Sequence, residues 1–484
     1  VTTDKIFDMV VKIRKKTNIP MVFMTYANVV FSYGTERFIR KAAEIGMDGL
    51  ILPDVPFEEK EEFDVVCKQY GLELISLIAP TSHDRITRIA KEANGFVYCV
   101  SSLGVTGTRT RITTDIGAMV KLVKDFLMKE YLPHVSEYEA KGEYPLEFHK
   151  KLGELGLFAM DVPEEYGGMG LDTTTAAMMI EEGAKVESTF MGMFNVTSMG
   201  GKIVMAAGNE EQKQYYSSLL QKGYLSSFCL TEPDAGSDSA AVRTTAVRKG
   251  DSYVINGTKM FITNASLASV FLVVATLDPS KGSKGLATFI VEKDRPGVTV
   301  GKKIEKIGMR LSNTAEVIFD NVEIPAFNLI GTEEGGFANA MKVLTASRPI
   351  IAASSLGACQ LARDLAIQYS KERVAFGKPI CAKQMIQEKI ANMEMLIQAG
   401  RGLVYNATML LDQGKPCNKE ASIAKCFVTE AYGKITDDAL QIFGGYGLCD
   451  EYLISKLYRD ARVNRIIEGT NEIQRVVIAK SLLR

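Results

Sequence analysis

A single carboxylate near the end of the chain is the side chain best suited to proton chemistry. Glu468 follows two isoleucines and precedes Gly469 within the stretch Ile466–Arg475. We expect Ile466 and Ile467 to face an apolar pocket, where poor solvation raises the pKa of a carboxyl toward the working pH of a base. An ordinary glutamate near the start of a helix is the simpler interpretation of this stretch alone, so the rest of the chain must decide.

The inventory of other reactive side chains narrows the choice. The only histidines are His83, His134 and His149, so a Ser-His-Asp triad or a His-ligated metal centre is excluded from the C-terminal two thirds. The 8 cysteines are scattered without a Cys-x-x-Cys pair, which indicates reduced thiols rather than disulfides or a zinc site. Chemistry in that region must come from carboxylates or from a bound organic cofactor, and no metal site is predicted.

Composition sets further limits. The 484 residues allow two to four domains, and 46% of them are hydrophobic. The formal net charge is -1 with no long charged run, which argues against a protein that binds nucleic acid or a membrane surface. No apolar run reaches the length of a membrane span, and no signal peptide or targeting segment is visible. We therefore expect a cytoplasmic protein of bacterial type.

Residues 1–124 alternate short apolar strands with amphipathic helices. The expected strands are 21–26, 49–53, 73–78 and 95–100. Continuous apolar strands with helices between them indicate a parallel sheet covered on its faces, here half of a (β/α) barrel. This segment resembles the tryptophan synthase alpha subunit in the stretches 24–26, 31–34, 48–54, 77–82 and 98–107.

That resemblance covers about the middle half of the family's length. The family's catalytic Glu and Asp lie upstream of it and its last two strands lie downstream, so we expect no tryptophan synthase activity. Gly104 to Gly107 could present backbone N–H groups to a phosphate, but a plain loop is the simpler interpretation. A half barrel leaves sheet edges and its interior open, which predicts the least stable part of the chain.

The junction with the next segment carries no linker. Apolar residues keep helical spacing from Ile116 to Leu127, which predicts one helix through the join. A recombined or misassembled sequence is the simpler origin, because both flanking segments are cut short there.

Three further segments follow. Residues 125–227 are expected to be helical, with one amphipathic helix from Glu137 to Leu157. Residues 228–330 change to strands, with a hairpin turn predicted at Asn256–Gly257. Residues 331–484 return to long helices that pack as a bundle, at 338–371, 383–413, 419–443, 451–467 and 472–483, the first kinked at Pro349.

The order helical, β and helical, together with five motifs, resembles the acyl-CoA dehydrogenase family over residues ~125–484. The motifs are Cys229–Asp238, Lys259–Asn264, Arg373–Pro379, Gln441–Gly447 and the Glu468 stretch. The resemblance implies an all-α N-terminal domain, an antiparallel β-barrel middle domain and a C-terminal four-helix bundle. It also implies an FAD-dependent oxidoreductase of fatty acid metabolism that acts on CH–CH groups, fused to a barrel fragment.

The same resemblance implies the residues that bind FAD. A flavin needs donors for its ring oxygens, a surface against its ring, and N–H groups or an arginine for its diphosphate. The matching positions are Leu230, Thr231, Gly236, Ser237, Phe261, Ile262, Thr263, Arg373, Phe376, Gln441, Gly444, Gly445, Thr470 and Glu472.

Some of these positions depart from the family or have simpler interpretations. Phe261 stands where the family often carries Trp, and Glu472 stands where some members carry Gln. Arg373 and Phe376 match residues that reach the FAD of a neighbouring subunit, which implies a homotetramer or homodimer. Without the resemblance, Phe261 would be core, Arg373 a surface charge and Gly444 a helix C-cap.

The implied reaction is α,β-dehydrogenation of an acyl-CoA thioester to the trans-2-enoyl-CoA. Glu468 would remove the α-proton, flavin N5 would accept the β-hydride, and the electrons would pass to an electron-transfer flavoprotein. The backbone N–H of Glu468, with a ribityl hydroxyl of FAD, would donate to the thioester carbonyl. Ser237, Arg348 and Gly469 are the implied substrate contacts, although Arg348 equally fits a salt bridge within the bundle.

Other functions stay open at this point. An acyl-CoA oxidase, which passes electrons to oxygen, has the same motifs. A chimera in which the barrel fragment blocks assembly would lose FAD and be inactive. A lyase function of the first segment ranks last, and the length and branching of the acyl chain are not readable from the sequence.

Overall fold

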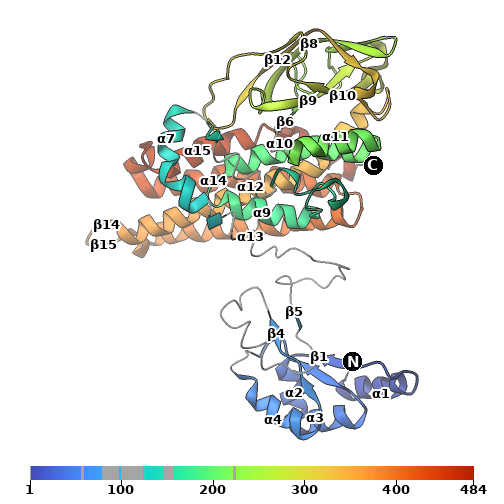
Figure 1. Ribbon diagram of the computed structural model, residues 1–484. Coiled ribbons are helices and arrows are strands. Elements are labelled where there is room, and N and C mark those ends of the chain that lie inside the picture. Colours follow the sequence, from blue (N-terminus) through green and yellow to red (C-terminus); the bar gives the residue numbers. More distant parts are fainter. Residues whose placement is uncertain are drawn as a thin grey trace. The chain divides into compact units, whose positions relative to one another are not determined.

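The computed structural model describes residues 2–55, 59–78, 98–99, 121, 124–125, 127–142, 144–146, 157–221 and 225–483. Its contacts divide the chain into two compact units, Val1–Gly117 and Ala118–Arg484 (Figure 1). The loop Gly104–Gly107, most of the junction helix, His83 and His149 lie outside the described residues.

The first unit is built from β/α repeats. Its parallel sheet has the order β1 (Val22–Met24), β2 (Gly49–Ile51), β3 (Glu73–Leu74), and β4 (Leu77–Ile78) pairs in parallel with β5 (Tyr98–Cys99). The helices are α1 (Thr3–Arg14), α2 (Ala27–Tyr33), α3 (Thr35–Glu44) and α4 (Glu61–Gln69). The rings of Phe7, Phe23 and Phe38 meet in its core. Parallel strands joined by helices confirm the expected partial (β/α) fragment.

The second unit begins with helical structure. After the short helices Leu127–Tyr131 and Leu132–His134 come α7 (Val135–Lys141), α9 (Thr173–Ala184), α10 (Ser188–Ala207) and α11 (Glu210–Gln221). The helix predicted from Glu137 to Leu157 is not continuous. α7 stops at Lys141 because Gly142 adopts φ +62°, a left-handed conformation that closes a helix. Residues 147–156, where the predicted helix would end, lie outside the described residues.

The middle of this unit is an eight-stranded sheet. Its order is β11 (Val298–Val300), β12 (Thr314–Pro325), β8 (Ser252–Thr263), β7 (Thr245–Lys249), β9 (Ala268–Thr276), β10 (Leu286–Glu292), β13 (Leu329–Ile330), and β6 (Leu225–Cys229) pairs with β9. Most neighbouring strands are antiparallel, and the β6–β9 pair is parallel.

The hairpin predicted at Asn256–Gly257 is wrong, because β8 runs through both residues as one strand of 12 residues. The turn lies earlier, where Lys249 pairs with Ser252 around Gly250, whose φ is +62°. Gly257 is needed for close approach instead: a Cβ there would lie 2.4 Å from Thr244 Oγ1 and 2.7 Å from Thr244 Cα. Close packing against the residue that precedes β7 therefore requires this glycine, and the resulting Asn-Gly dipeptide looks like a turn signal.

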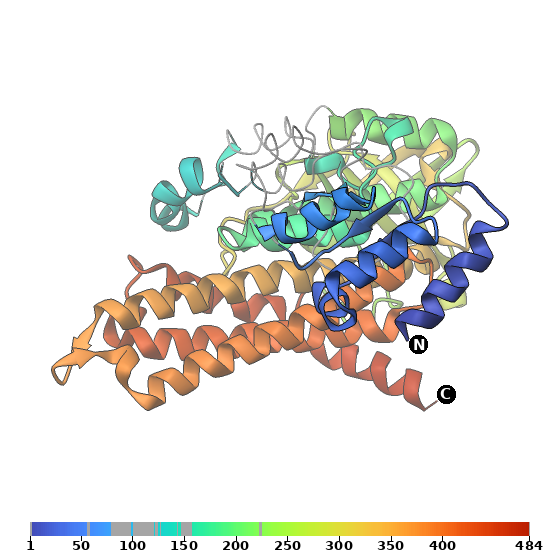
Figure 2. The ribbon, with the colours of Figure 1, turned by 90° about the horizontal axis from the view of Figure 1, so that it is seen from below.

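The C-terminal part is a bundle of long helices. α12 (Gly336–Glu372), α13 (Gln384–Asp412) and α14 (Asn418–Phe443) pack on one another, and α15 (Leu453–Asn464) and α16 (Asn471–Leu482) pack on α14. Figure 2 shows the long helices side by side in orange and red. α12 continues through Pro349 as one helix. It is long and apolar enough to cross a membrane, but 72% of its most apolar window is buried, as in a core helix.

A buried ionic cluster joins the three parts of the second unit. Lys456 of α15 donates to Glu187 at 3.0 Å, just before α10, and to Asp460 at 2.6 Å. Asp460 in turn accepts from the backbone N–H of Met309, which follows β11. These interactions fix the β sheet and the N-terminal helices onto the bundle that carries Glu468.

Candidate active site

Glu468 lies in the short turn between α15 and α16. Glu468 and Gly469 adopt φ of +56° and +87°. A left-handed conformation is unfavourable by about 1 kcal/mol or more for a residue other than glycine, so surrounding contacts must hold it. Lys425 and Gln474 supply them, donating to the Gly469 carbonyl at 2.8 and 2.9 Å. The backbone of the turn is thereby fixed with the carboxylate directed toward α12.

The carboxylate of Glu468 is held by α12. Ser347 Oγ donates to Glu468 Oε2 at 2.8 Å. Burial raises the pKa of Glu468, and Ser347, Lys425 and Arg348 act in the opposite direction. The prediction that both Ile466 and Ile467 face an apolar pocket is partly wrong, since Ile466 is 53% exposed. Sequence spacing did not identify Ser347 of α12 or Lys425 of α14, both of which lower this pKa against the effect of burial.

Two buried cations lie near this carboxylate. Arg348 donates to Asn418 Oδ1 at 2.8 Å and to Ser422 Oγ at 3.3 Å, and burial lowers its pKa while Glu468 raises it. Among the described residues no carboxylate pairs with Arg348 within 4.0 Å, so the expectation of a bundle salt bridge is not met. Burial also lowers the pKa of Lys425 to about 8, and Glu468 opposes this shift. Lys425 was missed from the sequence because it lies on another helix.

The first two flavin motifs meet on the β sheet. The backbone N–H of Met260, in β8, donates to the Thr231 carbonyl at 2.9 Å. Beneath them Lys259 donates to Glu232 at 2.8 Å and to the Leu230 carbonyl at 3.1 Å. This buried pair, also missed, fixes the 230–232 segment against β8. Gly236 and Ser237 are exposed on the following turn, and a Cβ at Gly236 would meet no atom within 4 Å.

The residues of the second motif, Lys259–Asn264, differ in how far their side chains are exposed. Phe261 adopts φ +59° and is 61% exposed, so the alternative that it belongs to the core is wrong. The side chain of Ile262 is buried in the β-sheet core, which leaves its backbone for a ligand. Thr263 is half-buried and pairs with Thr314. An exposed aromatic held in a left-handed conformation is typical of a residue that contacts a ligand.

The hairpin of β14 (Val374–Ala375) and β15 (Lys378–Pro379), which follows Arg373 and carries Phe376 at its turn, lies at the far end of the bundle from the β sheet (Figure 1). Arg373 caps the C-terminus of α12, and the hairpin begins at the next residue. Phe376 and Gly377 form its two-residue turn with φ of +55° and +74°. Phe376 is 94% exposed, and Lys383 Nζ lies 5.5 Å from the centre of its ring.

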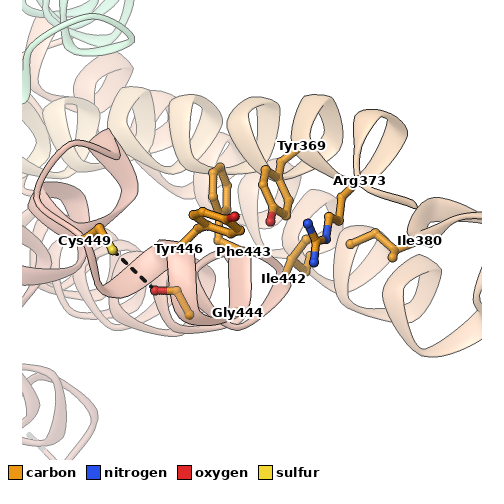
Figure 3. A pocket seen from close by; sticks show the side chains of 9 residues that line it. Tyr369, Arg373, Ile380, Ile442, Phe443, Gly444, Tyr446 and Cys449 are labelled. Carbon is orange, nitrogen blue, oxygen red and sulfur yellow. Dashed lines mark hydrogen bonds between the residues drawn. The ribbon is translucent and has the colours of Figure 1, made fainter. Parts of the chain in front are cut away.

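A pocket of about 460 Å³ adjoins Arg373 (Figure 3). Arg373 lies over the Tyr446 ring at 5.7 Å, and the Tyr369 ring stacks on Phe443 at 4.2 Å. A Cβ at Gly444 or Gly445 would meet no atom within 4 Å, so a ligand can reach their backbone. The pocket is lined by Tyr369, Arg373, Ile380, Ile442, Phe443, Gly444, Gly445, Tyr446 and Cys449. Arg373, Gly444 and Gly445 were predicted as site residues, and the others were not.

The remaining predicted positions have different surroundings. Gln441 is exposed on α14, one turn before Gly444. Thr470 caps α16, accepting from Ile473 N–H, and Glu472 is exposed in the first turn of that helix. The structure thus forms three groups, around Glu468, around Thr231 and around Arg373. No hydrogen bond or ion pair between described side chains links the Arg373 group to the other two.

Comparison with known proteins identifies this arrangement. Sequence profiles of the acyl-CoA dehydrogenase N-terminal, middle and C-terminal domains match residues 113–223, 227–322 and 334–483. The tryptophan synthase alpha chain profile matches residues 1–132. The second unit therefore has the three-domain architecture of a flavin-dependent acyl-CoA oxidoreductase.

Individual relatives indicate the same family as the sequence profiles. An acyl-CoA dehydrogenase of Bacillus subtilis is 45% identical over 374 residues, 77% of this chain and 99% of that protein. The butyryl-CoA dehydrogenase of Megasphaera elsdenii is 39% identical with a TM-score of 0.75, over 78% of this chain and 100% of that one. A chain from a structural study of the electron transferring flavoprotein of Acidaminococcus fermentans is 40% identical to this chain. Its TM-score and coverage are the same as those of the Megasphaera elsdenii protein. This chain belongs to the acyl-CoA dehydrogenase family.

FAD is the cofactor of the family, and the residues present fit it. The backbone at Gly236, Gly444 and Gly445 is open to close approach, as a diphosphate requires. The guanidinium of Arg373 is exposed beside the pocket. The exposed ring of Phe261 offers an aromatic surface against which a flavin ring can pack.

Proposed function

We propose that the chain catalyses α,β-dehydrogenation of an acyl-CoA thioester to the trans-2-enoyl-CoA, with Glu468 as the α-proton base. The observation that carries the proposal is the setting of Glu468. It is a partly buried carboxylate with a raised pKa, held in a left-handed turn and hydrogen-bonded to Ser347. A base of raised pKa is suited to removing the proton of a weakly acidic α-carbon near neutral pH.

Other groups around the base have separate proposed roles in binding the substrate and stabilising negative charge. The backbone N–H of Glu468 has no acceptor in the described part of the chain, so it is free to donate to the thioester carbonyl and stabilise the developing negative charge. Arg348 and Lys425 add positive potential beside that carbonyl. Ser237 and Gly469 are the further proposed substrate contacts. When bound, FAD supplies the hydride acceptor for the β-carbon.

We further propose that the flavin is held by two copies of the chain. Leu230, Thr231, Ile262 and Thr263 would hold its ring, and Arg373, Phe376, Gln441, Gly444 and Gly445 would serve the cofactor of a neighbouring subunit. Exposure of Phe376 supports this, because no described contact uses its ring except that with Lys383. An electron-transfer flavoprotein is the proposed electron acceptor, in keeping with the subject of the Acidaminococcus fermentans structure.

Glu468→Gln tests the assignment. The variant keeps the size and hydrogen-bonding capacity of the side chain but cannot accept the α-proton, so kcat should fall by about 10²–10⁴-fold. Flavin absorbance of the purified protein should match that of wild type. Glu451→Gln changes an exposed carboxylate before α15 and serves as control. Retained turnover in Glu468→Gln would contradict the proposal, and peroxide release in place of reduced acceptor would indicate an oxidase.

A further inference from the structure

We propose that Ser347 is a positioning residue for the base, with a hydroxyl that turns between Glu468 Oε2 and the Leu344 carbonyl as the base gains and loses its proton. The inference rests on the proposed role of Glu468. It assigns a function to a residue of α12 that no motif of the sequence identified.

Two acceptors lie within reach of one hydroxyl. Ser347 Oγ is 2.8 Å from Glu468 Oε2 and 3.1 Å from the Leu344 carbonyl oxygen. A hydroxyl has one proton to donate and lone pairs to accept with, so it can serve only one of these acceptors fully at a time. Ser347 is fully buried, at 0% exposure, so water does not replace either partner. The Leu344 carbonyl thus provides an alternative acceptor when the carboxylate no longer needs the proton.

The charged neighbours do not make this hydrogen bond redundant. Arg348 of α12 and Lys425 of α14 act electrostatically on Glu468, yet neither forms an ion pair with it within 4.0 Å in the described part of the chain. Arg348 donates to Asn418 and Ser422, and Lys425 donates to Gly469 and Asn471. From α16, Glu472 is exposed and Gln474 donates to backbone. Among described side chains, Ser347 is therefore the one that hydrogen-bonds the carboxylate.

The proton balance during the reaction follows from this geometry. In the resting state the Ser347 proton points to the Glu468 carboxylate, which it holds in place and stabilises as the anion. When the substrate Cα–H bond breaks, its electron pair stays on the substrate and an O–H bond forms on Glu468. The Ser347 proton then turns to the Leu344 carbonyl, and Ser347 Oγ can accept from the new carboxyl O–H. Ser347 gains and loses no proton, so both states of the base stay hydrogen-bonded.

The experiment compares three variants of the full-length, flavin-loaded protein. Ser347→Ala removes the hydroxyl and Ser347→Thr keeps one. Ser354→Ala removes another buried hydroxyl of α12, two helical turns after Ser347. The Ser354 hydroxyl donates to the Ser188 carbonyl and not to Glu468. The pH dependence of kcat is measured with butyryl-CoA as substrate. The infrared band of the protonated carboxyl, assigned with Glu468→Gln, is titrated as a readout independent of turnover.

The inference predicts that the acidic limb of the kcat profile and the infrared titration both move up by about one pH unit in Ser347→Ala. At a pH below that limb, kcat should be about tenfold lower than in wild type. Ser347→Thr and Ser354→Ala should keep the wild-type limb. A wild-type limb in Ser347→Ala, or an equal shift in Ser354→Ala, overturns the role of Ser347. If wild type itself shows no turnover, the proposed function fails, while the infrared titration still decides whether Ser347 sets the pKa of Glu468.

Discussion

Lys425 Nζ lies 2.8 Å from the carbonyl oxygen of Gly469, the residue that follows the candidate base. The same ammonium group donates at 2.9 Å to Asn471 Oδ1, on the first residue of α16. One buried cation of α14 thus supports the turn in which Glu468 adopts φ +56°. The placement of the base depends on this contact because its backbone conformation is unfavourable by itself.

Lys425→Met should therefore weaken both catalysis and folding. The Gly469 carbonyl and the Asn471 side chain lose a charged donor, which lowers the free energy of unfolding by about 2 kcal/mol. Loss of the fixed turn should lower kcat by at least about tenfold, since small misplacements of a catalytic group are costly. Denaturant unfolding and steady-state kinetics measure the two effects. Lys434→Met replaces an exposed lysine of the same helix and should change neither; equal behaviour of the two variants would contradict the role.

The effect of Lys425 on stability should depend on pH. Burial lowers its pKa to about 8 in the folded protein, against about 10.4 in an unfolded chain. Between these values the unfolded chain binds a proton that the folded chain does not, so the free energy of unfolding rises with pH. The difference in unfolding free energy between wild type and Lys425→Met should be about 2 kcal/mol larger near pH 10 than near pH 7. Urea titrations at both pH values measure it, and a constant difference would show that this pKa is not lowered.

Gly257 provides a prediction for the β sheet. A methyl group at this position would overlap Thr244, whose Cα would lie 2.7 Å from the new Cβ. Gly257→Ala should lower the free energy of unfolding by about 1–3 kcal/mol, because backbone atoms must move to relieve the overlap. A Cβ at Gly402, in α13, would meet no atom within 4 Å, so Gly402→Ala should be neutral or stabilising by up to about 1 kcal/mol. Thermal unfolding of both variants gives the comparison.

The sequence predicted the helices and strands of the second unit because their periodicity is local. It failed at Asn256–Gly257, where glycine is required by close packing against Thr244, the residue before β7, and not by a turn. It also failed at Gly142, where the sequence pattern of an amphipathic helix continues past a residue that closes the helix. Gly257 is decided by a tertiary contact and Gly142 by its backbone conformation.

In the active site too, the sequence predicted the local motif but not the contacts made by distant parts of the chain. Glu468 was identified from its motif and Arg348 as an expected substrate contact, but Ser347, which hydrogen-bonds the carboxylate, and Lys425, which holds the turn, were not identified. Ser347 is 121 residues away in sequence, and Lys425 is 44 residues from the carbonyl it holds. Ile466, only two residues before Glu468, is exposed instead of lining a pocket. A buried carboxylate takes its environment from whichever helices pack on it, and single-chain spacing does not specify those contacts.

Phe376 provides the test of assembly. Its side chain is 94% exposed at the tip of the β14–β15 hairpin, so Phe376→Ala should change the stability of a single chain by no more than about 0.5 kcal/mol. If the ring contacts the FAD of a neighbouring subunit, the same change should lower the ratio of flavin to protein absorbance and the mass in solution. Val374, 57% exposed on the same hairpin, provides the matched control, because Val374→Ala removes a comparable exposed apolar side chain away from the tip. Equal flavin loss in both variants would mean that the hairpin as a whole, and not the Phe376 ring, retains the cofactor. A wild-type protein that is already monomeric and colourless would instead support the inactive chimera, in which the barrel fragment prevents the second copy from supplying Arg373 and Phe376.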